Sequence, residues 1–446
     1  MAEQLNFNVL REAMAGRAAA LRCRQTLQPA GGPGSKVFPP TYSGAVYATE
    51  KRRVPGREDP VDCVLLDSVQ SQANRMEEAL QQAVDEGRLK LPVIAVDFEP
   101  YFDEAKARLP AGQRGDMDLL DPVGKVTSLQ APHRIADAIL RDSMLEDKPF
   151  RESDIGRKID RAEARNATPL FEICPTALLF GMWDSTGPKG GLGAKFERAL
   201  VSEIVGIGAV YGVKTSSRID PLGVQLKAGP IYAASNELGW TLDASEARQI
   251  KGKPVMLGKE GKPSEVNHGN VTPSFGKYGK GAEGRDPLRG SDEAREGRIA
   301  PGGVTIEHAE QTIVISLAGL RRLRFPVDGQ YDRDRDAAGR TVIAALGLVA
   351  AALADEAGLD LRSRCLLYPE ADLDWELLDR SGGGSFALPP ERAIEIYNDA
   401  VEEAKKAGLP WRDEPLKLQP SEPLVKLVVK SQNLAAQQVA DEEGGE

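Results

Sequence analysis

The stretch TALLFGMWDSTGPKGGLGAKFERALVSEIVG, residues 176–206, joins an apolar run to a glycine-rich loop and then to a second patterned segment. We interpret residues 173–183 as a strand that enters the loop. We interpret residues from about Gly193 to Gly206 as a helix, because apolar residues recur there every three or four positions. Backbone amides at a helix N-terminus attract phosphate. The stretch therefore predicts an anion site, whose ligand is either a nucleotide or a longer polymer.

The glycine-rich loop does not have the sequence of a nucleotide-hydrolysing enzyme. Such loops need G-x-x-x-x-G-K-[ST], in which the lysine reaches the outer phosphates and the hydroxyl binds magnesium. Here the loop reads GPKGGLGAK and contains neither G-K-[ST] nor the dinucleotide pattern G-x-G-x-x-G. The segment VIAVD, ending at Asp97, imitates a magnesium-holding strand but precedes the loop instead of following it. Nucleotide chemistry is therefore disfavoured.

A phosphate polymer suits the same residues and several other basic segments. Each segment taken alone could be an ordinary solvated surface. Together they are several modest basic surfaces without a catalytic cluster, and this combination favours a protein that follows a nucleic-acid backbone. Polar residues recur on one face of the helix expected at 64–85, in VKTSSR (213–218) and in a basic N-terminal loop. The candidate RNA-binding residues are Lys36, Lys51, Arg52, Arg53, Gln72, Asn74, Arg75, Lys189, Gly190, Gly191, Lys195, Arg198, Lys214 and Arg218.

Composition indicates a globular protein with room for two or three domains. The chain has 446 residues, of which 41% are hydrophobic and 28% charged, and its net charge is −10. The apolar run 342–354 is shorter than the roughly 18 residues that a membrane span needs. Four scattered cysteines fit a reducing cytoplasm and isolated core thiols, and the three histidines do not lie near them. We therefore expect a cytoplasmic protein that binds no membrane, metal or cofactor.

Strands and helices alternate with long interruptions, which favours an α+β fold over a doubly wound sheet. Residues 224–303 have the character of an insertion, and 251–289, rich in glycine and lysine, that of an extended arm. The expected strands are 17–28, 91–98, 173–183, 209–219, 311–325 and 363–369, and the expected helices are 64–85, 131–144, 193–206 and 341–356.

Acid–base and metal chemistry have weak support. His133 and Asp137 are four residues apart on an expected helix face, and a structural pair is the favoured interpretation. Asp184 follows a predicted strand and could bind a metal, although an aspartate that caps a turn explains it as well.

Four longer segments of the sequence resemble a known family. FPPTYSG (38–44), LLDSVQSQANRMEEAL (65–80), APHRIADAILRDS (131–143) and LLFGMWDSTGPKGGLGAKFERALVSEIVGIGAVYGVKTSSRIDP (178–221) closely resemble the type I-G (formerly I-U) CRISPR-associated RAMP backbone subunit, the repeated large subunit of a Cascade complex. The resemblance extends over roughly residues 5–370 and is weaker in the acidic segment that follows.

The resemblance implies a modified RNA-recognition-motif (ferredoxin-like) palm with finger and thumb insertions. Residues 1–370 would form this core, with insertions at about 91–170 and 224–303, and 371–446 would be an acidic C-terminal extension. Copies would polymerise along guide crRNA without catalysis, joined by other Cascade subunits, and present the bases for pairing with target DNA. Two alternatives stay open: a metal-dependent ribonuclease of the RAMP superfamily that uses Asp184, and a phosphate-ligand enzyme built on the glycine-rich loop.

Overall fold

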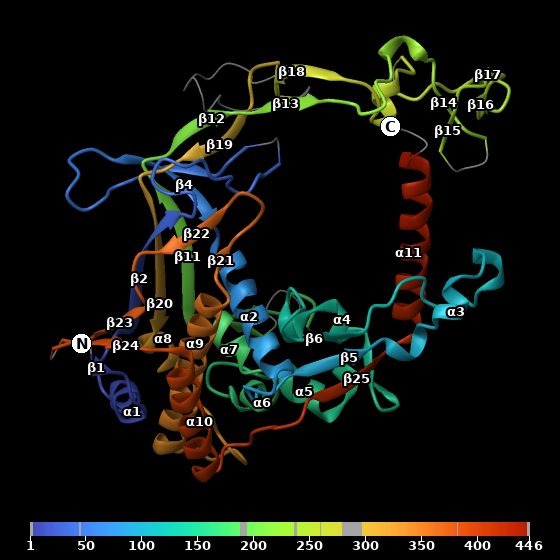
Figure 1. The fold of residues 1–446 in the computed structure, drawn as a ribbon. Coiled ribbons are helices and arrows are strands. Elements are labelled where there is room, and N and C mark those ends of the chain that lie inside the picture. Colours follow the sequence, from blue (N-terminus) through green and yellow to red (C-terminus); the bar gives the residue numbers. More distant parts are fainter. Residues whose placement is uncertain are drawn as a thin grey trace. The chain divides into compact units, whose positions relative to one another are not determined.

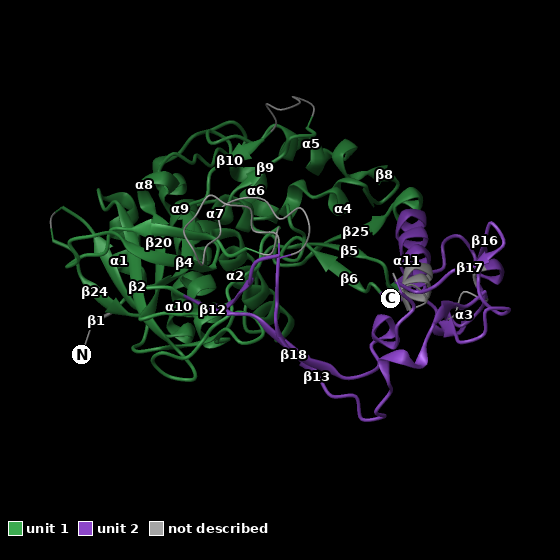
Figure 2. Cartoon of the chain, turned by 90° about the horizontal axis from the view of Figure 1, so that it is seen from above, with its two compact units in different colours: residues 1–99, 123–210, 303–424 green, residues 100–122, 211–302, 425–446 purple. Residues whose placement is uncertain are grey.

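The computed structural model describes residues 3–43, 46–187, 194–235, 239–258, 260–278, 297–380 and 382–443 (Figure 1). The chain forms two compact units, each assembled from separate parts of the sequence (Figure 2). Unit 1 comprises Met1–Glu99, Val123–Val210 and Gly303–Leu424, and unit 2 comprises Pro100–Pro122, Tyr211–Gly302 and Val425–Glu446. The chain passes between them through Glu99–Pro100, Pro122–Val123, β12 (Val210–Val213), β19 (Pro301–Thr305) and α11 (Glu422–Glu443).

Unit 1 is built on a ten-stranded sheet. Its strands pair antiparallel, except that β1 and β24 are parallel. Along the sheet the order is β1 (Glu3–Gln4), β24 (Ser385–Ala387), β23 (Asp374–Leu378), β2 (Ala20–Pro29), β20 (His308–Ser316), β11 (Leu200–Ile207), β4 (Val61–Asp67) and β3 (Thr49–Arg52), with β22 (Leu366–Pro369) beside β2 and β21 (Leu359–Asp360) beside β22.

One face of this sheet is buried because its strands alternate apolar and polar residues. In β20 the side chains of Ala309, Ile313 and Ile315 are buried, whereas those between them are half-buried. Successive side chains of a strand point to opposite faces, so every second residue of β20 faces the helices. On the other face, Arg22 and Arg24 of β2 are partly exposed and form ion pairs with glutamates of β23 and β20.

Helix α9 (Arg333–Glu356) is the central helix of unit 1 (Figure 1). Asp332 caps its N-terminus, and residues 341–353 are all buried. Within the described residues, α9 alone is long and apolar enough to cross a membrane, but 83% of its most apolar window is buried inside the fold. It is therefore a core helix, packed against α1 (Phe7–Ala15), α2 (Val69–Asp85), α7 (Thr176–Phe180), α8 (Leu317–Leu320) and α10 (Pro390–Lys406).

A second, five-stranded sheet also belongs to unit 1. Its order is β6 (Lys125–Thr127), β5 (Ile94–Asp97), β25 (Leu416–Pro420), β7 (Ser143–Leu145) and β8 (Lys148–Pro149). The same region contains α4 (Ala138–Arg141), α5 (Asp154–Asp160) and α6 (Thr168–Ile173). Residues 371–424 thus supply β23, β24, α10 and β25 to unit 1. The boundaries of the two compact units therefore differ from the expected division into a core of 1–370 and an extension of 371–446.

Unit 2 contains a long two-stranded ribbon and short hairpins. The ribbon pairs β13 (Thr215–Arg218) with β18 (Val271–Phe275), and the hairpins pair β14 (Tyr232–Ala233) with β15 (Trp240–Thr241) and β16 (Gln249–Ile250) with β17 (Lys253–Pro254). Ile231, Ala233 and Leu257 form a small core there. In the other part of unit 2, which includes α3 (Glu104–Ala107), the side chain of Gln432 in α11 accepts hydrogen bonds from the amides of Leu120 and Asp121.

The α+β prediction is confirmed, and so are the strands expected at 17–28, 91–98, 209–219 and 363–369 and the helix at 341–356, which here begins earlier. Two other expectations are wrong. Residues 173–183 form α6, α7 and only the short strand β9 (Met182–Trp183), whereas 193–206 contains β10 (Lys195–Phe196) and most of β11. The described residues from 194 onward form strands where a helix was expected, so the helix N-terminus on which the anion site was predicted is not found in this part of the chain; most of the loop itself, residues 188–193, lies outside the described residues.

Three further expectations are right only in part. The segment 64–85 is divided between β4 and α2, which begins after Ser68. The segment 131–144 contains one turn of 3-10 helix (Arg134–Ala136) and α4. The strand expected at 311–325 ends at Ser316, where α8 begins.

Candidate nucleic-acid interface

A hollow of about 570 Å³ opens in unit 1 and is lined by basic and aromatic side chains. Three segments form it: 132–141, 180–186 and 195–198. The four cationic side chains of the lining are Arg134, Arg141, Lys195 and Arg198. We call this hollow, with its lining, the basic hollow.

Two short strands fix the orientation of the lining. β9 and β10 are antiparallel, with Trp183 opposite Lys195 and Met182 opposite Phe196. Met182 and Phe196 are buried, so the alternation of side chains turns Trp183 and Lys195 to the exposed side. Trp183 is 58% exposed.

Gly181 brings the two strands close together. Its φ is +81°, and a Cβ at this position would lie 3.0 Å from the carbonyl oxygen of Phe196 and 3.1 Å from the amide nitrogen of Arg198. Glycine adopts such a conformation without steric cost, and any side chain here would be strained. Gly181 therefore holds Arg198 against the hollow.

A buried ion pair forms the floor of the basic hollow. Arg134, which is 7% exposed, donates to both carboxylate oxygens of Glu77 at 2.6 and 2.7 Å and to the carbonyl oxygen of Gly181 at 3.1 Å. Its guanidinium lies over the ring of Phe180. Burial raises the pKa of Glu77 to about 7, although the charge of Arg134 opposes this shift. Arg134 is thus a positioned structural cation whose charge is already balanced.

Lys195 and Arg198 are different, because both are exposed and the described residues offer them no ion pair. Burial, and then the charge of Arg134, lower the pKa of Arg198 from its usual range. Arg141 donates to Asp142 at 2.7 and 2.9 Å and is partly exposed. Lys195 and Arg198 thus form no ion pair with a described residue, although the charge of the buried Glu77 acts on Arg198, and such exposed cations attract anions.

Asp184 lines the hollow but is held by its neighbours. It is 8% exposed, accepts hydrogen bonds from the amide and hydroxyl of Thr186 at 3.0 Å and forms an ion pair with Arg151. Burial opposes the effect, but the hydrogen bonds from Arg151 and Thr186 keep the pKa of Asp184 below its usual value. The interpretation as a turn-capping aspartate is confirmed. Among the described residues, no three His, Cys, Asp or Glu side chains are grouped to hold a metal.

His133 and Asp137 do not share a helix face as expected, but they do form a structural pair. The backbone amide of His133 donates to Asp137 at 3.1 Å, and the other carboxylate oxygen of Asp137 caps α4 through Ile139. His133 itself is exposed at the wall of the hollow.

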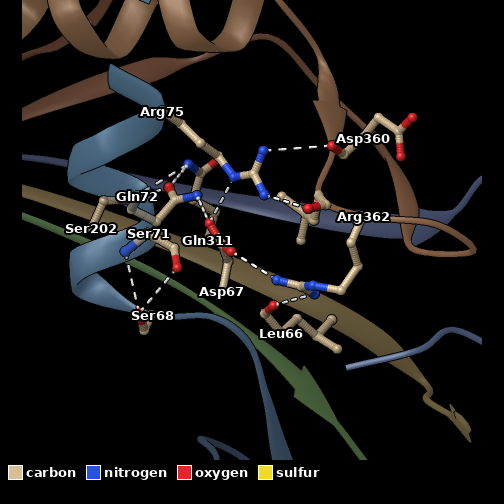
Figure 3. A network of polar contacts seen from close by, with 11 residues as sticks. Leu66, Asp67, Ser68, Ser71, Gln72, Arg75, Ser202, Gln311, Asp360 and Arg362 are labelled. Atoms are coloured by element: carbon tan, nitrogen blue, oxygen red, sulfur yellow. Dashed lines mark hydrogen bonds and ion pairs between the residues drawn. The ribbon is translucent and has the colours of Figure 1, made fainter. Parts of the chain in front are cut away.

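On α2, the structure uses Gln72 and Arg75 for an internal network around Asp67 (Figure 3). Asp67 is fully buried and accepts hydrogen bonds from Gln72 at 2.7 Å and from Arg75 at 3.0 Å. Gln72 is 3% exposed and also accepts from Ser202 and Gln311. Gln72 therefore belongs to the interior and is not exposed to RNA, and its partner Ser202 is likewise buried. Asn74 is exposed.

The remaining candidates differ in how they are already bound. Lys51 pairs with Asp62, and Arg52 pairs with Glu203 and Glu50. Arg218 donates to the carbonyls of Gly269 and His268 and to Asn267 in unit 2. The exposed candidates without an ion pair to a described residue are Lys36, Arg53 and Lys214. Lys189, Gly190 and Gly191 lie outside the described residues.

Sequence reasoning missed Trp183, His133, Arg134 and Arg141 as parts of one site. His133, Arg134 and Arg141 lie in the segment APHRIADAILRDS (131–143), and Trp183 lies in the segment 178–221. Both segments resemble the known family. Nothing in the sequence shows that these segments meet in space.

The α+β unit thus carries a hollow in which two exposed cations, Lys195 and Arg198, form no ion pair with a described residue. Residues 21–211 match the family model described as CRISPR-associated protein GSU0053. This similarity to a CRISPR-associated family covers less than half of the chain but contains every residue that lines the basic hollow, and it supports a role in CRISPR defence. No curated protein matches the chain.

Proposed function

We propose that the chain is the crRNA-binding backbone subunit of a type I-G Cascade complex, and that the basic hollow holds the sugar-phosphate backbone of the guide. The observation that carries the proposal is the pair of exposed cations Lys195 and Arg198, which lack a described counter-ion and lie within the CRISPR-associated match. Phosphate contacts hold a nucleic acid without reading its sequence, as a subunit repeated along any guide requires.

The order of strands in unit 1 supports an RNA-recognition-motif-like palm. Neighbours β23, β2, β20 and β11 are antiparallel, α2 lies between β2 and β11 in the chain, and α9 lies between β20 and β23. This is the β-α-β-β-α-β arrangement of ferredoxin-like folds. The β3–β4 hairpin extends the sheet beyond β11.

The open face of this sheet supports RNA binding elsewhere. Arg22 pairs with Glu376 and Arg24 with Glu310, so these cations are already neutralised. The guide would therefore be gripped at the basic hollow instead of lying across the sheet.

We propose further that the subunit is cytoplasmic and non-catalytic and works with crRNA, target DNA, further copies of itself and other Cascade subunits. Asp184 supports the absence of catalysis, because Arg151 and Thr186 occupy both of its carboxylate oxygens. The metal-dependent ribonuclease is the alternative. Labelled single-stranded RNA should stay intact with magnesium for the wild type and for Asp184→Ala, and cleavage that Asp184→Ala abolishes would establish the alternative.

The direct test is binding of single-stranded RNA by fluorescence anisotropy at several salt concentrations. The double variant Lys195→Ala/Arg198→Ala should bind at least tenfold more weakly for any guide sequence. Its slope of log affinity against log salt should fall by about 1.4, since each neutralised phosphate contributes about 0.7. The matched control Arg24→Ala/Arg322→Ala removes two cations that glutamates already neutralise and should change little. Equal losses in both variants would refute the proposed site.

A further inference from the structure

Trp183 is an unusual tryptophan. Trp375 is fully buried, and Trp411 packs edge-on against Phe171 and Tyr397 at centroid distances of 5.0 and 6.3 Å. Trp183 is 58% exposed, against 42% for Trp240, and it lines the basic hollow without a ring partner among the described residues. An exposed indole ring in a hollow presents a flat apolar surface on which a bound molecule can pack.

The cross-strand register puts a cation beside this indole. Trp183 and Lys195 are directly opposite each other on β9 and β10, so their Cβ atoms lie about 5 Å apart on the same face. Arg198 follows three residues later on the wall of the same hollow. A flat apolar ring next to two ammonium or guanidinium groups matches the two parts of a nucleotide, its base and its phosphate.

The size and rim of the hollow fit such a ligand. Its volume of about 570 Å³ lies within the roughly 300–1,000 Å³ of sites for small organic groups. Gln70 and Ser185 add exposed polar groups to the lining, which can bond a sugar or a base edge. A site for phosphate alone would need neither this volume nor an indole.

We infer that the basic hollow takes one whole nucleotide of the RNA, with its base stacked on Trp183 and its phosphate held by Lys195 and Arg198. This inference rests on the proposed function and deepens it: one base in the bound strand is removed from its neighbours and held by the protein. Stacking accepts any base, because every base has a π-face.

The experiment compares a single-stranded RNA with an oligonucleotide of the same length that carries abasic sites in place of bases, both measured by anisotropy. Wild type should bind the intact strand roughly 5- to 150-fold more tightly, the range that corresponds to one stacked base. Trp183→Ala should lose this preference and bind the abasic strand as wild type does. Trp183→Phe, which keeps a ring, should retain part of it, and Trp240→Ala, which removes another exposed tryptophan in unit 2, should retain all of it.

Two negative outcomes are distinguishable. If wild type binds intact and abasic strands equally while Lys195→Ala/Arg198→Ala still weakens binding, the nucleotide site is refuted and the phosphate site survives. If wild type binds neither strand, the proposed function itself fails. Tryptophan fluorescence supplies an independent readout: the quenching that RNA causes in wild type should be reduced in Trp183→Phe, and unchanged quenching would overturn the stacking contact.

Discussion

Replacing Asp67 by alanine should destabilise unit 1 strongly while leaving the basic hollow intact. The carboxylate is fully buried and accepts three side-chain hydrogen bonds, from Gln72 at 2.7 Å, from Arg75 at 3.0 Å and from Arg362 at 3.0 Å. Removing one partner of a buried charge pair typically costs about 3–5 kcal/mol. The two arginine side chains are 29% and 26% exposed and keep backbone acceptors, so water recovers part of the loss. We expect the lower end, about 3 kcal/mol, or roughly a 150-fold change in the unfolding constant.

The measurement is urea unfolding followed by circular dichroism, with Asp62→Ala as the matched control. Asp62 lies on the same strand, β4, but its side chain is 67% exposed and pairs with Lys51 at the surface. Such a pair contributes at most about 1 kcal/mol. If Asp67→Ala loses no more stability than Asp62→Ala, the reasoning that assigns Gln72 and Arg75 to a structural network is refuted.

Three further outcomes are expected. Lys36→Ala/Arg53→Ala should flatten the salt dependence of RNA binding by up to about 1.4, whereas Lys51→Ala, whose cation is already paired, should leave it unchanged; equal slopes for all variants would contradict this. Because burial raises the pKa of Glu77 from 4.5 to about 7, the folded protein holds that proton more tightly, and this group should make the free energy of unfolding rise as pH falls from 7 to 4.5. Glu77→Gln should lack this component, and identical pH slopes for variant and wild type would disprove the shift. Gly181→Ala should cost about 1–3 kcal/mol because of its positive φ and close contacts, so an unaltered melting temperature would show that the strand pair adapts.

The elements with the clearest periodicity were predictable from sequence. In β2, polar and apolar residues alternate from Leu21 to Leu27 except at Gln25, which is polar but buried. The helix from 341 onward is apolar almost all round, as a buried helix must be. Its first two turns were missed because they carry Arg333, Asp334, Arg335 and Asp336. The cap at Asp332 was the available signal for its true beginning.

Short apolar runs were assigned wrongly because they are compatible both with the 3.6-residue period of a helix and with the two-residue period of a strand. Leu65 continues the helical spacing of α2 backwards but lies in β4, and the Ser68 side chain that accepts from the amide of Ser71 marks the real start. Residues 200–207 contain apolar residues at helical spacing, yet they form β11, where tertiary pairing with β4 and β20 decides the conformation. Such runs cannot be assigned by periodicity alone.

The site was predictable only in fragments. Lys195 and Arg198 were identified as part of a helix that begins at the loop, whereas the described residues from 194 onward form β10 and β11. Arg134 reaches the same place from a distant segment through its bonds to Glu77 and Gly181. Convergence of this kind depends on the tertiary fold, so residue type and spacing do not reveal it.

The buried position of α9 has a consequence for synthesis of the chain. The helix leaves the ribosome well before α10, which packs against it and ends at Lys406, 50 residues after Glu356. At about 5–20 residues per second, an apolar helical face is left uncovered for several seconds. A nascent chain, or a fragment ending near residue 370, would therefore present to chaperones a segment with the composition of a membrane span. The acidic C-terminal part of the chain, which has the weakest resemblance to the family, supplies α10 and thereby completes the cover that α1, α2, α7 and α8 begin.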